Sequence, residues 1–299
     1  MNLLITGAWQ QAKEHIAEIE QMGHTVAFLQ YEKDELPCAY EWVEGIIGNG
    51  IFLTHPIEKF VNLRYIQLTS AGFDRVPMDY VKEHNIMIHN ARGVYSVPMA
   101  EFAVSGVLQL YKQASFFREN QQKHQWVKER DIMEIYGKRV VIVGCGSVGT
   151  ECAKRFGAFG CRVIGVDVMA REDEQYDVIK ALDTLDQELS AADILILSVP
   201  LTDMTRRLMN AERLKRLKHD AILVNISRGS VVDERALEQC INRIGGAVLD
   251  VFESEPLAED SILWDMENVL VTPHNSFVGE GNGRRMRELF LSNLMLEDK

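Results

Sequence analysis

The chain has 299 residues, a length that suits one large domain or two medium-sized domains. Hydrophobic residues make up 46% of it and charged residues 25%, as in globular proteins with a buried core. The net charge of −12 repels nucleic acids and anionic membrane surfaces, so neither is an expected partner.

The sequence shows no sign of export or of a membrane span. No apolar run approaches the roughly 18 residues that a membrane-spanning helix needs, and the first residues lack the basic region of a signal peptide. The five cysteines have no framework spacing, which is typical of reduced thiols, and we expect a cytoplasmic protein. No cysteine or histidine pair has the spacing of zinc ligands, so no metal site is expected.

The first third of the chain alternates short apolar runs with longer segments of helical pattern. The runs predict strands at Leu3–Thr6, Thr25–Leu29, Gly45–Ile47, Tyr65–Leu68 and Ile86–His89. Helices are expected between them, at Gln11–Gln21 and Met78–His84. This order predicts a parallel sheet with helical crossovers.

A long helix, Pro98–Glu119, is predicted next, with a proline in its first turn, and we interpret it as the connector between two domains. A second alternating series follows. Its strands are nearly continuous apolar runs, as expected when both faces of a sheet are covered. They are predicted at Arg139–Val143, Arg162–Val166, Ile194–Val199, Ala221–Ile226, Ala247–Leu249 and Val269–Val271. Helices are predicted at Ser147–Phe159, Asn210–Leu217 and Asp233–Ile244.

A glycine-rich segment joins the first strand of this second series to its helix. It reads Gly144-Cys145-Gly146-Ser147-Val148-Gly149, the GxGxxG pattern in the strand–turn–helix context of a dinucleotide site. The first glycine permits a tight turn, the second lets the backbone approach a pyrophosphate, and the third lets helix and strand pack closely. The helix N-terminus would then face the phosphates. These glycines could also serve only a tight turn, but their context favours dinucleotide binding.

Asp167 follows the next predicted strand, 18 positions after Gly149. This is close to the roughly 20 residues at which an acidic side chain binds the ribose hydroxyls of NAD. A carboxylate at this point would repel the 2′-phosphate of NADP. The sequence therefore favours NAD as the cofactor.

Three polar side chains, Arg228, Glu255 and His274, each lie shortly after a predicted strand of the second series. Ligands of open α/β sheets bind at that edge. The planar fork of an arginine can bind the carboxylate of a 2-oxo acid and polarise its ketone. Hydride arrival leaves negative charge on the ketone oxygen, and histidine is the natural proton donor for it. A carboxylate beside the histidine stabilises the imidazolium and orients the ring.

These motifs together resemble those of the D-isomer-specific 2-hydroxyacid dehydrogenases, which include phosphoglycerate dehydrogenases, hydroxypyruvate reductases and D-lactate dehydrogenases. The resemblance covers essentially the whole chain and rests on GxGxxG followed by Asp, N-x-S-R-G, LDVF-x-x-EP and TPH. It implies an oxidoreductase that transfers a hydride between NAD(H) and C2 of a small D-2-hydroxy or 2-oxo acid. Pyruvate, glyoxylate, hydroxypyruvate and branched 2-oxo acids all remain open as substrates.

The resemblance also implies a role for each motif. Arg228 would bind the substrate, His274 would be the acid/base, Glu255 its partner, and Asp250 would contact the nicotinamide carboxamide. The residues implied for NAD are Gly144, Gly146, Ser147, Val148, Gly149, Asp167, Val199, Pro200, Thr205, Ile226, Ser227, Arg228, Asp250 and His274. Those implied for the substrate are Ser70, Ala71, Gly72, Phe73, Arg228 and His274, with the 70–73 backbone N–H groups receiving the carboxylate.

Each of these residues also has a purely structural interpretation. Arg228 could form a surface ion pair, His274 could be structural, Glu255 could be a turn residue, Asp250 could cap a helix, and residues 70–73 could form an ordinary turn between a strand and a helix. Two other functions stay open, a non-catalytic NAD(H) sensor of the corepressor kind and a phosphite-type dehydrogenase. Formate enzymes are disfavoured, because they carry glutamine where Glu255 stands.

The resemblance predicts an α/β fold of two Rossmann-like lobes, with a doubly wound parallel-sheet NAD-binding domain inserted in a flavodoxin-like substrate domain. The substrate domain would comprise residues 1–95 and 276–299, with a final helix within Phe277–Leu296, and the NAD-binding domain residues 96–275. The helix after Pro98 resembles the family's dimer contact, so a homodimer is expected. About 25 residues follow His274, so no regulatory tail is expected, and Asn275–Val278 departs from the family's usual small-residue loop.

Overall fold

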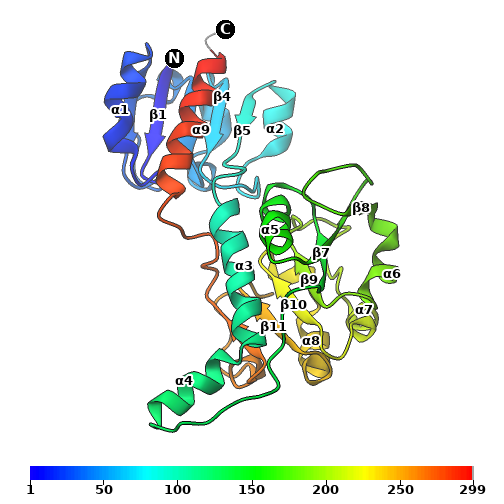
Figure 1. The fold of residues 1–299 in the computed structure, drawn as a ribbon. Coiled ribbons are helices and arrows are strands. Elements are labelled where there is room, and N and C mark those ends of the chain that lie inside the picture. Colours follow the sequence, from blue (N-terminus) through cyan, green and yellow to red (C-terminus); the bar gives the residue numbers. More distant parts are fainter. Residues whose placement is uncertain (298–299) are drawn as a thin grey trace. The chain divides into compact units, whose positions relative to one another are not determined.

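The computed structural model describes residues 1–297 (Figure 1). Its contacts divide the chain into two compact units. Met1–Tyr95 and the segment from Gly279 onwards form the first unit, and Ser96–Val278 form the second.

The first unit is built on a parallel sheet of five strands in the order β2-β1-β3-β4-β5, which is the flavodoxin-like order. The strands are β1 (Asn2–Thr6), β2 (Thr25–Leu29), β3 (Gly45–Gly48), β4 (Tyr65–Leu68) and β5 (Met87–His89). The helices are α1 (Ala12–Gln21), α2 (Met78–Glu83) and α9 (Asn282–Glu297). Successive side chains of a strand point to opposite faces. Leu3 and Ile5 are accordingly buried on the face that Phe290 of α9 covers, and Leu4 is buried on the other face with Phe60.

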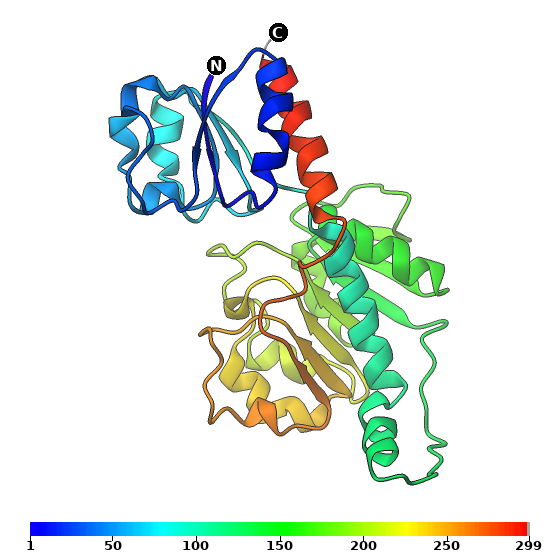
Figure 2. The same cartoon turned by 90° about the vertical axis from the view of Figure 1, so that its left-hand side faces the viewer.

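Helix α9 is separated from α1 by most of the sequence, yet the two pack side by side in this unit (Figure 2). The Trp9 and Phe290 rings meet edge to face, with centroids 5.1 Å apart. At the helix surface, Arg287 Nε donates to Glu18 Oε2 at 2.9 Å. The last helix therefore completes a core that the first strand and helix begin.

The second unit contains a parallel sheet of seven strands in the order β12-β11-β10-β9-β6-β7-β8. The strands are β6 (Arg139–Val143), β7 (Arg162–Asp167), β8 (Val178–Ala181), β9 (Ile194–Leu197), β10 (Ile222–Asn225), β11 (Gly246–Leu249) and β12 (Val269–Val271). The helices are α3 (Ser96–Tyr111), α4 (Ala114–Gln122), α5 (Ser147–Ala158), α6 (Leu185–Leu189), α7 (Ala211–Arg216) and α8 (Glu234–Cys240). The strand order reverses between β6 and β9, and this reversal is where doubly wound sheets bind ligands.

Both faces of the larger sheet are buried. Val141 and Val143 belong to one hydrophobic cluster, whereas Val140 and Ile142 belong to the cluster on the opposite face. Helix α3 lies directly on the sheet at Gly106, where an added Cβ would stand 2.6 Å from a methyl carbon of Val248. The predicted α/β fold with two parallel, doubly wound sheets is therefore confirmed.

One predicted helix of the second unit is wrong, and two elements of the unit were not predicted, strand β8 and helix α6, which has only five residues. The single helix expected over Pro98–Glu119 is divided into α3 and α4, because Gln113 adopts a left-handed conformation with φ +53°. Strand β8 was not predicted, since it has only four residues and includes the charged Lys180 at the edge of the sheet. Figures 1 and 2 both show α4 and the segment after it projecting from the rest of this unit.

Candidate active site

The glycine-rich segment forms the turn between β6 and α5 that the sequence predicts. Gly144 has φ +94°, and a Cβ on it would lie 2.8 Å from the Ser198 carbonyl oxygen. A Cβ on Gly149 would lie only 2.1 Å from the carbonyl oxygen of Gly144. Both positions therefore exclude side chains, and the backbone of the turn is bare enough for a pyrophosphate to approach. Ser147 begins a helix of 12 residues, whose N-terminus offers unpaired N–H groups to such a group.

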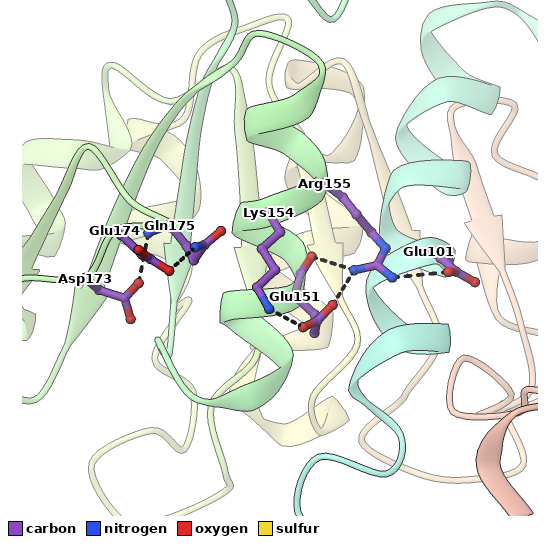
Figure 3. A network of polar contacts seen from close by, with 7 residues as sticks. All are labelled: Glu101, Glu151, Lys154, Arg155, Asp173, Glu174 and Gln175. Carbon is purple, nitrogen blue, oxygen red and sulfur yellow. Dashed lines mark hydrogen bonds and ion pairs between the residues drawn. The ribbon is translucent and has the colours of Figure 1, made fainter. Parts of the chain in front are cut away.

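Figure 3 shows polar side-chain contacts within α5, between α5 and α3, and in a nearby loop. Arg155 bonds Glu151 one turn earlier and reaches Glu101 on α3, with Nη2 and Oε1 3.2 Å apart. Lys154 pairs with the same Glu151 at 2.8 Å. The Arg155–Glu101 contact connects α5 to α3, and the other two contacts lie within α5. In the nearby loop, the Gln175 N–H donates to Asp173 Oδ1 at 3.0 Å.

Asp167 lies at the end of β7, next to the glycine-rich turn. Its Oδ2 accepts from the Cys145 N–H at 3.2 Å and from Arg171 Nη1 at 2.8 Å, and its Oδ1 accepts from the Val168 N–H at 2.8 Å. Burial acts to raise the pKa of this carboxyl, but the hydrogen bonds from Arg171 and the two backbone groups outweigh it, so the pKa is lowered. The carboxylate is therefore ionised at neutral pH. Arg171 is a partner that sequence reasoning missed, although it stands only four residues away.

The loop after β9 carries the residues predicted along the adenine. The Thr205 hydroxyl donates to the Pro200 carbonyl at 2.6 Å, and it accepts from the Thr202 N–H at 2.7 Å. Thr205 is nearly buried, and Val199 is half-buried. The threonine thus orders this loop, and a direct contact of Val199, Pro200 or Thr205 with the cofactor stays a prediction.

Arg228 follows β10 in a loop that Asn225 organises. The Asn225 side chain is buried, accepts from the Ser227 hydroxyl at 2.8 Å and donates to the Arg228 carbonyl at 3.1 Å. Ile226 and Ser227 are buried beside it, and Arg228 Nη1 donates to the Ser227 carbonyl at 2.8 Å. The sequence pattern had included Asn225 without assigning it this role.

His274 and Glu255 are brought together from the ends of two neighbouring strands. His274 Nδ1 lies 2.8 Å from Glu255 Oε2, and Glu255 Oε1 accepts from the Phe252 N–H at 3.1 Å. Both side chains are about 40% exposed, at 41% for the histidine and 38% for the glutamate. Because Nδ1 faces the carboxylate, Nε2 is the ring nitrogen left for a proton transfer. The Phe277 ring meets the imidazole edge to face, with centroids 6.0 Å apart.

Asp250 fixes the loop that carries the histidine. Its side chain is completely buried. Oδ1 accepts from the Thr272 hydroxyl at 2.6 Å and the Asn275 N–H at 2.8 Å, and Oδ2 accepts from the Ser276 N–H at 2.9 Å. These bonds hold His274 at φ +50°, a left-handed conformation that is unfavourable for a residue with a Cβ. Contact of Asp250 with a nicotinamide carboxamide stays a prediction.

Strand order explains why these side chains share an edge. Strands β10, β11 and β12 are neighbours in one parallel sheet, and Arg228, Glu255 and His274 follow their respective carboxyl ends. A Cβ on Gly229 would lie 1.8 Å from the Phe252 carbonyl carbon, so the first two loops touch. Within residues 1–297, no group of three or more histidine, cysteine, aspartate or glutamate side chains is arranged to hold a metal ion. No helix in that part of the chain has the length and apolar character to cross a membrane.

The predicted substrate loop belongs to the first unit, where it follows β4. The Ser70 hydroxyl donates to the Gly72 carbonyl at 3.0 Å, and Asn90 Nδ2 donates to the Ala71 carbonyl at 2.6 Å. The Tyr95 hydroxyl donates to the Thr69 carbonyl just before the loop. Several carbonyl groups of the loop are thus engaged within the unit, and binding of a substrate by its backbone N–H groups stays a prediction. Phe73 is 38% exposed.

Comparisons with known proteins agree with this geometry. The D-isomer specific 2-hydroxyacid dehydrogenase NAD binding domain matches residues 104–276. A glyoxylate reductase of Korarchaeum cryptofilum is 33% identical over 255 residues, which cover 81% of this chain and 77% of that protein. The structure of a D-lactate dehydrogenase from Aquifex aeolicus, complexed with NAD and lactic acid, is 25% identical with a TM-score of 0.78, covering 98% of this chain and 94% of that one. A D-isomer specific 2-hydroxyacid dehydrogenase from Xanthobacter autotrophicus Py2, in complex with NADPH, is 27% identical with a TM-score of 0.75, covering 96% and 92%. The predicted family is therefore confirmed: this chain belongs to the D-isomer specific 2-hydroxyacid dehydrogenases, oxidoreductases that use a nicotinamide dinucleotide.

Proposed function

We propose that the chain catalyses the reversible transfer of a hydride between NAD(H) and C2 of a small 2-hydroxy or 2-oxo acid, with His274 as the acid/base. The contact of 2.8 Å between His274 and Glu255 carries this proposal. Glu255 follows β11 and His274 follows β12, and Arg228 follows β10, the next strand of the same sheet. The glycine-rich turn lies at the same edge of the same sheet. The bare backbone at Gly144 and Gly149 and the ionised Asp167 fit a dinucleotide.

Bound NADH supplies the hydride when the oxo acid is reduced. The Arg228 guanidinium binds the substrate carboxylate and polarises the ketone. His274 gives a proton from Nε2 to the oxygen that becomes negative, while Glu255 holds Nδ1 and stabilises the imidazolium. In the oxidation the neutral imidazole takes the hydroxyl proton.

A panel of 2-oxo acids with NADH and with NADPH, followed by absorbance at 340 nm, tests this function. His274→Gln should lower the rate of the chemical step by about 100-fold to 10,000-fold, since it removes the proton donor. NADH binding, measured by fluorescence, should change little. His219→Gln is the matched control, because His219 is exposed and precedes β10, at the opposite edge of the sheet. NADH binding by the wild type without turnover of any 2-oxo acid would refute the proposed reaction and favour a sensor or a phosphite-type dehydrogenase.

NAD(H) is the proposed cofactor, because the Asp167 carboxylate can accept hydrogen bonds from the ribose hydroxyls. Exclusive use of NADPH in the same panel would contradict this role. We also propose that the backbone N–H groups of residues 70–73 bind the substrate carboxylate. Gly72→Pro would remove the N–H donor of residue 72 and should raise the KM for the oxo acid more than it changes NADH binding.

A homodimer formed through α3, α4 and the segment after α4 is proposed as the assembly. This region exposes large apolar side chains, which single soluble chains rarely gather on one projecting element. Trp126 is 95% exposed and Phe117 is 39% exposed. Trp126→Glu should convert a dimer to a monomer in light scattering coupled to size exclusion. A wild-type chain that is monomeric at micromolar concentration would contradict the proposal.

A further inference from the structure

Glu234 reaches from the start of α8 to the loop that carries Glu255. Its Oε2 accepts from the Glu253 N–H at 2.9 Å, and Glu253 stands two residues before Glu255. The helix has another cap, because the Asp233 side chain accepts from the Ala236 N–H at 3.1 Å. Neither the sequence motifs nor the proposed reaction accounts for the contact that Glu234 makes.

Glu234 and Glu255 bind successive N–H groups of the same backbone segment. The Phe252 N–H donates to Glu255 Oε1 at 3.1 Å, and the next N–H along the chain, that of Glu253, donates to Glu234. Because peptide bonds are planar, only the two dihedral angles of Phe252 separate these N–H groups. The direction of the first N–H therefore depends on how the second is held. The other carboxylate oxygen of Glu255 contacts His274 Nδ1 at 2.8 Å, so the effect extends to the imidazole.

The same peptide group is also in contact with the loop after β10. A Cβ on Gly229 would lie 1.8 Å from the Phe252 carbonyl carbon and 2.4 Å from the Glu253 nitrogen. The backbone at Gly229 therefore packs directly against this peptide. Glu234 belongs to the same stretch of chain, five residues after Gly229. One continuous segment thus carries the proposed substrate anchor at one end and the carboxylate that holds the Glu253 N–H at the other.

The surroundings of Glu234 are unfavourable for an ionised carboxylate. Burial raises its pKa, and the negative charges of Glu253 and Glu238 raise it further, whereas the hydrogen bond from the Glu253 N–H lowers it. Acidic groups with a raised pKa concentrate at functional sites. The nearby ion pair of Arg207 Nε with Glu253 Oε1, at 3.5 Å, involves an arginine that is 59% exposed and contributes little. The Glu253 N–H is therefore the contact that favours a charged Glu234 at this place.

We propose that Glu234 is a positioning residue that acts through Glu255 on the proton transfer by His274. By holding the Glu253 N–H, it fixes the peptide segment to which the Glu255 carboxylate is bonded, and so keeps that carboxylate in line with Nδ1 of the imidazole. In this role Glu234 contacts neither the substrate nor the cofactor. The inference rests on the proposed function, and it assigns to α8 a task that the proposed reaction alone does not require.

Steady-state kinetics of the full chain separate this role from a purely structural one. Glu234→Ala should lower kcat about threefold to tenfold and leave the dissociation constant of NADH within about twofold. Glu234→Asp keeps the charge but shortens the side chain, so its kcat should fall likewise. Glu234→Gln should recover most of the kcat, because its amide oxygen can accept the same bond. Glu238→Ala is the matched control, one turn later on the same helix and also half-buried, and it should change kcat less than about twofold.

A double-mutant cycle identifies the residue through which Glu234 acts. In a Glu255→Ala background no carboxylate is left to position, so the addition of Glu234→Ala should lower kcat by less than about twofold. Losses that multiply in the double variant, an unchanged kcat in Glu234→Ala and Glu234→Asp, or a Glu234→Gln enzyme as slow as Glu234→Ala would each overturn the inference and leave the proposed reaction intact. A wild type that binds NADH but turns over no 2-oxo acid would overturn the proposed function, and the inference with it.

Discussion

Replacing Asp250 with asparagine tests how the histidine loop is held. The carboxylate accepts three hydrogen bonds, from the Thr272 hydroxyl and from the backbone of Asn275 and Ser276. An amide has one oxygen, so its NH₂ group must face an N–H donor at one of the two backbone sites. Ser276 is only 3% exposed, so water cannot readily replace the lost partner.

The expected cost follows from this geometry. One buried donor left without an acceptor costs about 1 to 3 kcal/mol, and the two bonds that remain lose their charge assistance. The asparagine is cheaper to bury than a carboxylate, which offsets part of the loss. We expect the free energy of unfolding of the second unit to fall by about 2 to 3 kcal/mol. This corresponds to a decrease in Tm of about 4 to 12 °C for a unit of this size.

Differential scanning calorimetry and steady-state kinetics measure the two consequences of Asp250→Asn. The Tm of the second unit should fall, and kcat should fall with it, because His274 is no longer held at one position. Asp265→Asn provides the same chemical change at an exposed residue and should shift Tm by less than about 1 °C. A Tm within about 1 °C of the wild type and unchanged kcat in Asp250→Asn would show that the loop does not depend on this carboxylate.

Four further substitutions probe other parts of the second unit. Gly149→Ala should abolish detectable ADP-ribose binding in calorimetry, since its Cβ would lie 2.1 Å from a backbone oxygen. Gly157→Ala in the same helix is the control, because its Cβ would meet nothing within 4 Å, and it should raise the free energy of unfolding by up to about 1 kcal/mol. Glu188 lies between Arg139 and Lys180; burial acts to raise its pKa, but hydrogen bonds from the two cations outweigh it and lower the pKa below 4.5. A lowered folded-state pKa gives stability that is present above pH 4.5 and lost as pH falls through the folded value. In urea unfolding, Glu188→Gln should therefore be less stable than the wild type near pH 7. The difference in free energy of unfolding between the two proteins should narrow in acid. Glu255→Gln should lower kcat about tenfold or more without weakening NADH binding, because the amide orients the ring but cannot stabilise the imidazolium; equal kcat values would exclude that role.

The sequence carries most of the information about the cofactor edge of the second unit. Glycines at 144 and 149 are dictated by backbone contacts, so their spacing alone predicts the turn. His274 and Glu255 lie at the ends of adjacent strands, so chemistry and strand order together predict their meeting. Such features are local in the sequence or follow from the order of the strands.

Other features depend on side-chain direction, which a sequence pattern does not contain. The resemblance implies a nicotinamide contact for Asp250, but the sequence does not reveal that its carboxylate also accepts hydrogen bonds from backbone groups of the histidine loop. Arg171 was not considered, because nothing in the spacing shows that its side chain folds back onto Asp167. The break at Gln113 carries no glycine or proline signal, and so the helix was extended across it.

The packing of α9 on α1 has a consequence for biosynthesis. Trp9 leaves the ribosome about 280 residues before its partner Phe290, a delay of roughly 15 to 55 s at ordinary elongation rates. The second unit, whose residues are continuous, can fold during that interval, whereas the nascent amino-terminal sheet must wait with one apolar face uncovered. Chaperones that shield exposed apolar surface on translating ribosomes should therefore associate with the amino-terminal part of this chain for most of its synthesis.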